Sequence, residues 1–185
     1  MKLKFIMPVV FIPIIGLTSC NLSFSTEGKI EFFSQYYIAD GDTIYLDYNN
    51  QKTGLRFLGI DTPETKKAKN DVALLENIFA QKARQELKKL LNNKPIKVQI
   101  ISTDKYKRIV ARIWNYQNID VNVFLLKNGL ARVKYLDKNR NNINYWNNNW
   151  KIQQYYDTLI SIEAKARLNK IGIWKYKQDD IFYKK

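Results

Sequence analysis

Short segments in which apolar and polar residues alternate dominate the middle of this chain. A period of two is typical of a β-strand that buries one of its faces. In one such segment Ile44, Leu46 and Tyr48 fall on the same side. Others are rich in the aromatic and β-branched residues that favour strands. The chain therefore predicts a sheet of about five short strands, at residues 29–39, 43–48, 55–60, 95–102 and 108–114.

The turn-like residues 49–52 lie between two of these segments, those at 43–48 and 55–60. Two strands joined by a short turn form a β-hairpin. Asp42 and Asp61 stand equally far from a centre between Gln51 and Lys52. An antiparallel register centred there brings both carboxylates to the open end of the hairpin, near enough to share a cation.

Helical periodicity marks a longer segment and a shorter one. In residues 71–91 apolar side chains recur every three or four positions, with lysine and glutamine between them. Asp120 or Asn122 is placed to cap a short helix that continues to Leu126, and Gly129 is placed to end it.

A last helix is predicted over residues 150–169, closed by Gly172, after one more strand at 130–135. Strands with one inserted helix and one final helix indicate an α+β domain. Its expected core is a five-stranded oligonucleotide-binding-type β-barrel with about three helices. The domain is predicted to cover residues 29–176, and residues 177–185 to form a basic C-terminal tail.

Charge and residue usage narrow the chemistry. The 185 residues include 31 Lys and Arg against 17 Asp and Glu, a formal net charge of +14. Such an excess suits nucleic acid or an anionic membrane surface, although a biased genome also produces it. The absence of histidine excludes any imidazole base, nucleophile or metal ligand. The single cysteine, Cys20, excludes an internal disulfide and a thiolate zinc site.

The N-terminus has the pattern of an export signal. Lys2 and Lys4 precede an apolar run at residues 5–17, which is shorter than the ~20 residues of a membrane span. The run leads into Leu17-Thr18-Ser19-Cys20, which resembles a bacterial lipobox. We therefore expect residues 1–19 to be a signal peptide, Cys20 to carry lipid, and residues 20–28 to form a tether. The alternative is a plain secretory signal with a coincidental cysteine.

Taken singly, the charged motifs of the chain have ordinary structural explanations. The dipeptide Asp40-Gly41 is common in turns. The acids Asp61 and Glu64 can favour the start of a helix. Arg56 lies in a strand on the face opposite Leu55 and Phe57. In a barrel this position can point inward, where it needs an acidic or phosphate partner, or it can reach water from an edge. Arg108 alone is expected to be exposed.

Taken together, these motifs resemble the thermonuclease (staphylococcal nuclease) family from about residue 29 to residue 174. The resemblance rests on the order and local sequence of five segments. They are Asp40-Gly41-Asp42-Thr43, Arg56 to Thr65 with its Asp61-Thr62-Pro63-Glu64 core, Asp104-Lys105-Tyr106-Lys107-Arg108, Asn128-Gly129-Leu130-Ala131, and Gly172-Ile173-Trp174.

The resemblance implies a role for each matching residue. Asp42 and Asp61 would bind Ca²⁺ through carboxylates and Thr62 through its backbone carbonyl. Glu64 would deprotonate the attacking water, and Arg56 and Arg108 would hold the scissile phosphate. The remaining matches, which would contact the nucleotide, are Lys105, Tyr106 and Tyr135.

The implied activity is Ca²⁺-dependent hydrolysis of DNA and RNA with weak sequence preference, leaving 3′-phosphate ends. The expected substrates are single-stranded DNA and RNA, with double-stranded DNA left open. The protein is expected to act as a monomer outside the cytoplasm, anchored to a bacterial membrane or cell surface, or else secreted.

Two departures and two rival interpretations accompany this resemblance. Lys107 stands where the family has glycine, so a turn that needs a positive φ would be strained, and Asp137 replaces a family tyrosine. One rival is a barrel that binds nucleic acid without cutting it. The other is a surface lipoprotein that binds polyanions. The first has no use for three acids beside a phosphate, and the second predicts binding that is indifferent to Ca²⁺ and unaffected by Glu64→Gln.

Overall fold

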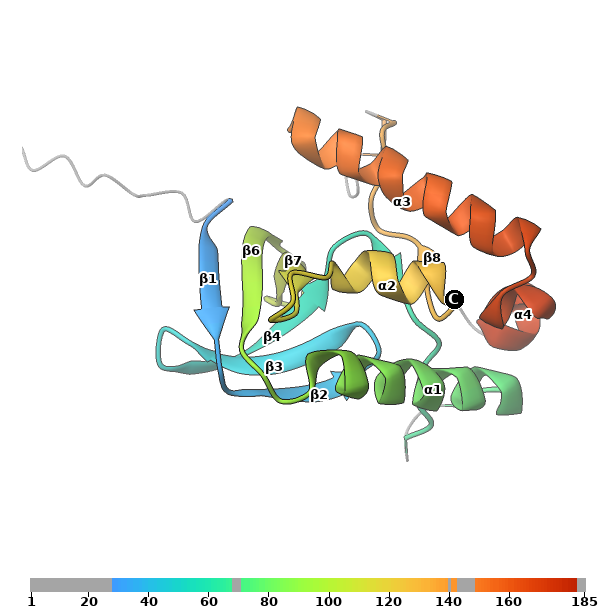
Figure 1. The fold of residues 1–185 in the computed structure, drawn as a ribbon, viewed down its shortest axis with the longest axis horizontal. Coiled ribbons are helices and arrows are strands. Elements are labelled where there is room, and N and C mark those ends of the chain that lie inside the picture. The colour runs from blue at the N-terminus through green and yellow to red at the C-terminus, as the bar shows by residue number, and fades with distance from the viewer. Residues whose placement is uncertain (1–27, 68–70, 140, 143–148, 183–185) are drawn as a thin grey trace, which may run out of the picture.

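The computed structural model describes residues 28–67, 71–139, 141–142 and 149–182. Residues 1–27, with the predicted signal peptide and Cys20, lie outside this range. The fold is a curled six-stranded sheet flanked by helices (Figure 1). The strands of the sheet are β1 (Ile30–Phe33), β2 (Tyr36–Asp40), β3 (Thr43–Tyr48), β4 (Gln51–Phe57), β6 (Ile96–Thr103) and β7 (Ile109–Trp114).

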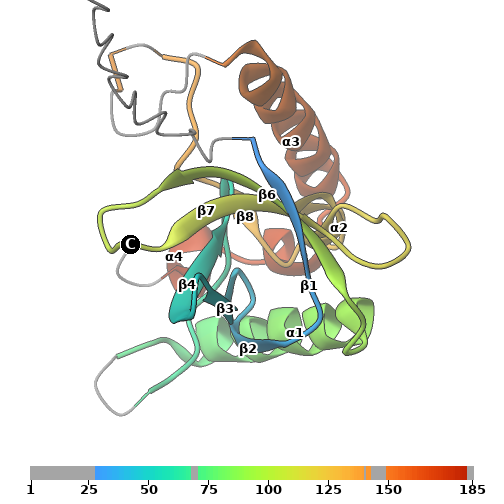
Figure 2. The ribbon, with the colours of Figure 1, turned by 90° about the vertical axis from the view of Figure 1, so that its left-hand side faces the viewer.

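The order of the strands explains why the sheet curls. It runs β1-β6-β7-β4-β3-β2, so β1 and β2 occupy opposite edges although only Ser34 and Gln35 separate them in the chain. Two edges joined by two residues must lie close together, which bends the sheet towards a barrel (Figure 2). The α+β class and the barrel type are confirmed. The single strand expected at residues 29–39 is wrong, because it breaks here into two.

The hairpin of β3 and β4 is confirmed, but its turn is centred two residues earlier than expected, so each residue of β3 pairs with a partner four positions earlier. Thr43 pairs with Arg56 and Tyr48 with Gln51, so the turn is centred between Asn49 and Asn50. Both asparagines have positive φ, as a two-residue primed turn requires. Asp42 therefore lies beside Phe57, which donates its N–H to the Asp42 carbonyl at 3.0 Å, and not opposite Asp61.

Helices cover the sheet on different sides. Helix α1 (Leu74–Leu91) packs along β2 and buries Ala83, Leu87 and Leu91 in the core (Figure 1). Helix α2 (Val121–Lys127) is capped by Asp120, whose carboxylate accepts the N–H of Val123 at 3.1 Å. Helix α3 (Trp150–Leu168) packs on α2.

Asn122, the other capping candidate, has a different role. Its side chain is fully buried and donates to the carbonyl of Leu58 at 2.6 Å, which ties α2 to the segment after β4. That segment leads into the short strand β5 (Ile60–Asp61), which pairs antiparallel with β8 (Arg132–Val133).

The C-terminal segment is more structured than a tail. Helix α3 ends at Leu168 with Asn169 as its C-cap, and Lys170 takes the positive φ, so Gly172 does not close this helix as expected. Gly172 instead begins the 3₁₀ helix η1 (Gly172–Lys175). Helix α4 (Gln178–Ile181) follows, and its buried end packs in a small cluster of Phe79, Ile173, Ile181 and Phe182. Within the described residues, no helix is both long enough and apolar enough to cross a bilayer.

A contact between Gly129 and the start of η1 generates a testable prediction. A Cβ at Gly129, whose φ is +57°, would lie 2.2 Å from the carbonyl oxygen of Ile171. We expect Gly129→Ala to lower the free energy of unfolding by about 2–4 kcal/mol, through backbone strain and displacement of η1. Urea unfolding measures the change.

Gly28 offers the matched control, because its φ is also positive (+80°) but no atom lies within 4 Å of the added Cβ. Gly28→Ala carries the strain without the clash and should cost about 1 kcal/mol. Equal losses in the two variants would contradict the assigned contact.

Candidate active site

Arg56 is the centre of the charged site. It lies on β4 opposite Thr43 and beside Val110 of β7, on the outward face of the sheet, while Leu55 and Phe57 fill the core. The side chain is only 12% exposed. The alternation of β4 is therefore as predicted, but the arginine points away from the barrel interior and is mostly buried beside Asp42, Asp61 and Tyr135.

Two carboxylates converge on this guanidinium. Nη1 donates to Oδ1 of Asp42, and Nη2 donates to Oδ1 of Asp61 at 3.0 Å. Burial disfavours the charged form of Arg56, but the charges of Asp42 and Asp61 outweigh it and raise the pKa of Arg56 above its usual value. Asp42 and Asp61 thus lie close together at one guanidinium, although the hairpin register that was expected to bring them together is wrong.

Each carboxylate has further donors. Asp42 accepts the backbone N–H of Thr62 at 2.8 Å and the hydroxyl of Thr43 at 3.0 Å. Asp61 accepts from Arg132, with Nη2 at 2.9 Å and Nε at 3.1 Å. Arg132 was missed from the sequence, although its place in the predicted strand 130–135 was the available signal. The pairing of Asp61 with Arg132 across β5 and β8 makes the contact.

The donor chemistry here fits a hard divalent cation. Two carboxylates converge within reach of one positive charge, and the backbone of Thr62 is bound to one of them. Oxygen ligands of these kinds are the ones that Ca²⁺ prefers. In the part of the chain that the structure describes, no cluster of three or more Asp, Glu, Cys or His has the geometry of a metal site. A cation would therefore depend on these two acids, on backbone oxygen and on water.

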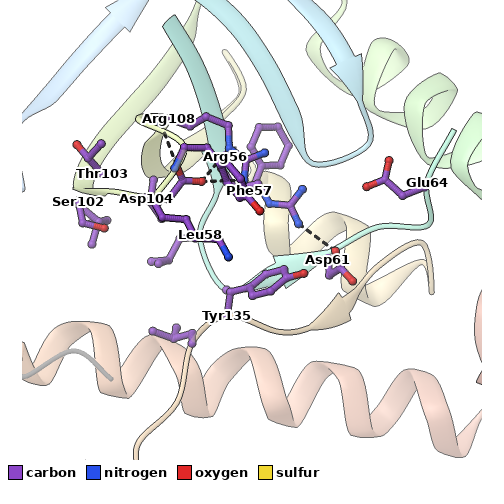
Figure 3. Close-up of a pocket in the computed structure, with 16 residues that line it drawn as sticks. Arg56, Phe57, Leu58, Asp61, Glu64, Ser102, Thr103, Asp104, Arg108 and Tyr135 are labelled. Atoms are coloured by element: carbon purple, nitrogen blue, oxygen red, sulfur yellow. Dashed lines mark hydrogen bonds and ion pairs between the residues drawn. The ribbon is translucent and has the colours of Figure 1, made fainter. Parts of the chain in front are cut away.

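Glu64 and Arg108 line the same pocket as Arg56. The cavity has a volume of about 620 Å³, and Asp61 and Tyr135 also line it. In the view of Figure 3, Glu64 lies at one side of the pocket and Arg108 at the other, with Arg56 and Asp61 between the two. The side chain of Glu64 is 37% exposed, so water can reach it. Asp42 and Thr62 are each 2% exposed and lie buried against Arg56 and Asp61.

Arg108 is held in the pocket by Asp104. Its Nη2 lies 2.7 Å and its Nε 2.8 Å from Oδ2 of Asp104, and its backbone N–H donates to Oδ1 at 3.0 Å. Burial alone would raise the pKa of Asp104, but the Arg108 hydrogen bonds and charge lower it overall. Lys107, in the family's glycine position, does take a positive φ of 62°. The strain is therefore present, and Arg108 nevertheless lines the pocket.

The predicted nucleotide-contacting residues surround the two arginines. Tyr135 places its ring 5.5 Å from the Arg56 guanidinium, and Tyr106, which is 67% exposed, lies 5.3 Å from that of Arg108. Lys105 lies 5.1 Å over the ring of Tyr106. Flat rings next to cations offer a base a stacking surface beside a bound phosphate.

The sequence of the domain decides its relationship to known proteins. A family model described as Staphylococcal nuclease homologue matches residues 54–176, which is well over half of the chain. The chain belongs to the staphylococcal nuclease family. The thermonuclease of Staphylococcus intermedius is 34% identical over 153 residues, which cover 82% of this chain and 80% of that protein.

Other members of the family give similar matches. The endonuclease YncB of Bacillus subtilis (strain 168) is 33% identical over 138 residues, 73% of this chain. That match spans only 57% of YncB, little more than half of its length. The thermonuclease of Staphylococcus hyicus is 33% identical over 139 residues, covering 74% of this chain and 72% of that protein.

The strained turn before Arg108 generates the second prediction. Replacing Lys107 by glycine removes the cost of a positive φ at a residue with a Cβ, so Lys107→Gly should raise the free energy of unfolding by about 1 kcal/mol. Lys105→Gly, in the same turn but without a positive φ, should lower it by adding chain entropy to the unfolded state. Urea unfolding of both variants is the measurement, and a loss of stability in Lys107→Gly would contradict the assignment.

Proposed function

We propose that this protein is a nuclease that hydrolyses phosphodiester bonds of DNA and RNA. One observation carries the proposal: two guanidiniums, those of Arg56 and Arg108, and the carboxylate of Glu64 line a single pocket. The family membership supports it, since related proteins bear the names thermonuclease and endonuclease. Positive charge for an anionic substrate and a carboxylate for water are the groups that such a reaction needs.

The arginines bind and stabilise the phosphate. Planar guanidiniums bind phosphate oxygens with two parallel hydrogen bonds. As the attacking oxygen adds, the phosphorus gains a fifth ligand and negative charge, and fixed donors that are already in place stabilise that charge. Asp42, Asp61 and the backbone carbonyl of Thr62 would hold Ca²⁺, which would supply further positive charge to the bound phosphate.

Glu64 acts as the general base in this proposal. It lies on the segment after β5 and its carboxylate is accessible to solvent, so it can hold a water molecule and take its proton. Attack that expels the 5′ oxygen leaves a 3′-phosphate on one product. Since the pocket offers contacts to phosphate and stacking surfaces, we expect weak base preference.

The rival interpretation is a barrel or surface lipoprotein that binds nucleic acid or other polyanions without cutting them. Such a protein needs cations and aromatic rings, and these are present here. It does not need a carboxylate in the phosphate pocket, where Glu64 and Asp61 would repel the ligand. The acids of the pocket therefore favour the enzyme.

The direct test uses the full chain with single-stranded DNA, in Ca²⁺ and in EGTA. We expect degradation only in Ca²⁺, with Glu64→Gln slowing it by about 10²–10⁴-fold, the usual contribution of a general base. Glu86→Gln is the control, because Glu86 is an acid of α1 whose described partner is Lys89. Binding without cleavage in every condition would support the rival.

Localisation is a separate proposal, supported by the N-terminal sequence. We infer that the chain is exported, cleaved before Cys20 and anchored outside the cytoplasm by lipid on that residue. Cys20→Ser should move the protein from the membrane fraction to the soluble fraction or block its processing, as measured by fractionation and labelling with a fatty acid. Ser19→Ala keeps a small residue before the cleavage point and should behave as the unmodified chain does. An unlabelled protein would instead indicate plain secretion.

A further inference from the structure

Two exposed tyrosines lie in one line across the sheet beside the pocket. Tyr37 on β2 pairs directly with Tyr45 on β3, and Tyr45 pairs directly with Gly54 on β4. Directly opposed residues point to the same face, with Cβ atoms about 5 Å apart. We name these three residues the tyrosine row. The strands that carry it lie together in Figure 2.

The tyrosine row lies on the outward face, which is also the face of Arg56. Core residues alternate with it along each strand, namely Ile38, Ile44, Leu46 and Leu55. The Thr43–Arg56 pair is two residues further along the same hairpin, or about 7 Å from the row. The tyrosine row and the phosphate pocket therefore lie next to each other on one face of the sheet.

Arg108 connects the two directly. A Cβ on Gly54 would lie 3.1 Å from Cγ and 3.4 Å from Cδ of Arg108, and 3.4 Å from a ring carbon of Tyr45. The stem of Arg108 thus crosses β4 over Gly54, next to the Tyr45 ring, on its way to the pocket. A side chain at Gly54 would occupy the space in which these two groups meet.

Cations flank each tyrosine. The Arg84 guanidinium of α1 lies 6.0 Å from the ring centre of Tyr37 and donates to its hydroxyl at 3.2 Å. Lys52 lies 5.7 Å over the ring of Tyr45. The acids nearby are Asp47, opposite Lys52 in the hairpin, and Asp40, which pairs with Lys67 at 2.9 Å. Arg108 is a further cation beside Tyr45, and Asp104 is its ion-pair partner.

Neither tyrosine is needed to fill the core. Tyr37 is 59% and Tyr45 37% exposed, so most of the Tyr37 ring and part of the Tyr45 ring face solvent. Exposed rings with cations beside them are the surfaces on which unstacked bases pack while the backbone phosphates are neutralised. A duplex keeps its bases stacked on each other, so this surface fits a single strand.

We propose that the tyrosine row is an extended subsite that binds two further nucleotides of a single-stranded substrate, one base on Tyr45 and one on Tyr37. This inference rests on the proposed function only for the direction of the path, since the chain would leave the pocket past Arg108. The consequence is a preference for single strands longer than the pocket alone can hold.

The experiment measures binding in EGTA, where the proposed reaction does not consume the ligand. Fluorescence anisotropy of the full chain compares a twelve-nucleotide oligothymidylate with a three-nucleotide one. Tyr37→Ala/Tyr45→Ala should weaken binding of the longer strand by about tenfold per tyrosine and leave the shorter one within about twofold. Tyr37→Phe/Tyr45→Phe keeps both rings and should bind as the unmodified chain does, which also controls for folding.

Two further controls separate stacking from other effects. Tyr116→Ala removes a tyrosine that is 51% exposed in the turn after β7 and should change nothing. A twelve-residue abasic strand, which has phosphates but no bases, should bind more weakly than the oligothymidylate and be insensitive to the alanine substitutions.

The proposal is overturned by any of three results: undiminished binding of the long strand by the double alanine variant, an equal loss with Tyr116→Ala, or a duplex bound as tightly as the single strand. Failure of the proposed function is seen separately, as intact oligonucleotide when Ca²⁺ replaces EGTA. Binding remains measurable in that case, so the two failures are distinguishable.

Discussion

The buried guanidinium of Arg56 is the interaction on which the rest of the site depends. Asp42 is only 2% exposed and Asp61 is fully buried. Two such carboxylates repel each other and lose their hydration. The guanidinium of Arg56 between them, with that of Arg132 on the other oxygen of Asp61, makes their burial tolerable. It can do so only if three segments are correctly placed: the start of β3, the outward face of β4, and β5. The two acids can therefore be buried at this site because the fold places a guanidinium between them.

The sequence predicted what local periodicity determines. Alternation located β3, β6 and β7, and helical spacing located α1 and α3, because each pattern reflects burial of one face of one element. Local periodicity did not predict three features of the fold. The break at Ser34 and Gln35 is imposed by closure of the sheet, the turn at Asn49 and Asn50 by their positive φ, and α4 by a few apolar residues that pack with Phe79. All three depend on contacts or backbone angles that a pattern does not contain.

The site shows the same division. The motifs identified Arg56, Glu64 and Arg108, and all three line one pocket. Arg132 was missed because its contact with Asp61 arises from the pairing of β5 with β8, two strands of two residues each with no periodicity to recognise. The tyrosine row was also missed, since Tyr37 and Tyr45 belong to predicted strands but their shared face with Arg56 follows only from the register. The sequence shows which residue types are available for a site. It does not show which of them become neighbours across paired strands.

In this arrangement Arg56 and a divalent cation would compete for the same oxygens of Asp42 and Asp61. In the structure, Arg56 holds one oxygen each of Asp42 and Asp61, while Thr62 and Arg132 donate to the other oxygens. A phosphate entering the pocket gives the Arg56 guanidinium new oxygen partners. Its hold on the carboxylates then weakens, and their negative charge becomes available to a cation. If Asp42 and Asp61 hold Ca²⁺, as in the proposed function, substrate and Ca²⁺ would bind with positive cooperativity. The phosphate would replace the carboxylates as the partner of Arg56, and the cation would replace Arg56 as the partner of the carboxylates.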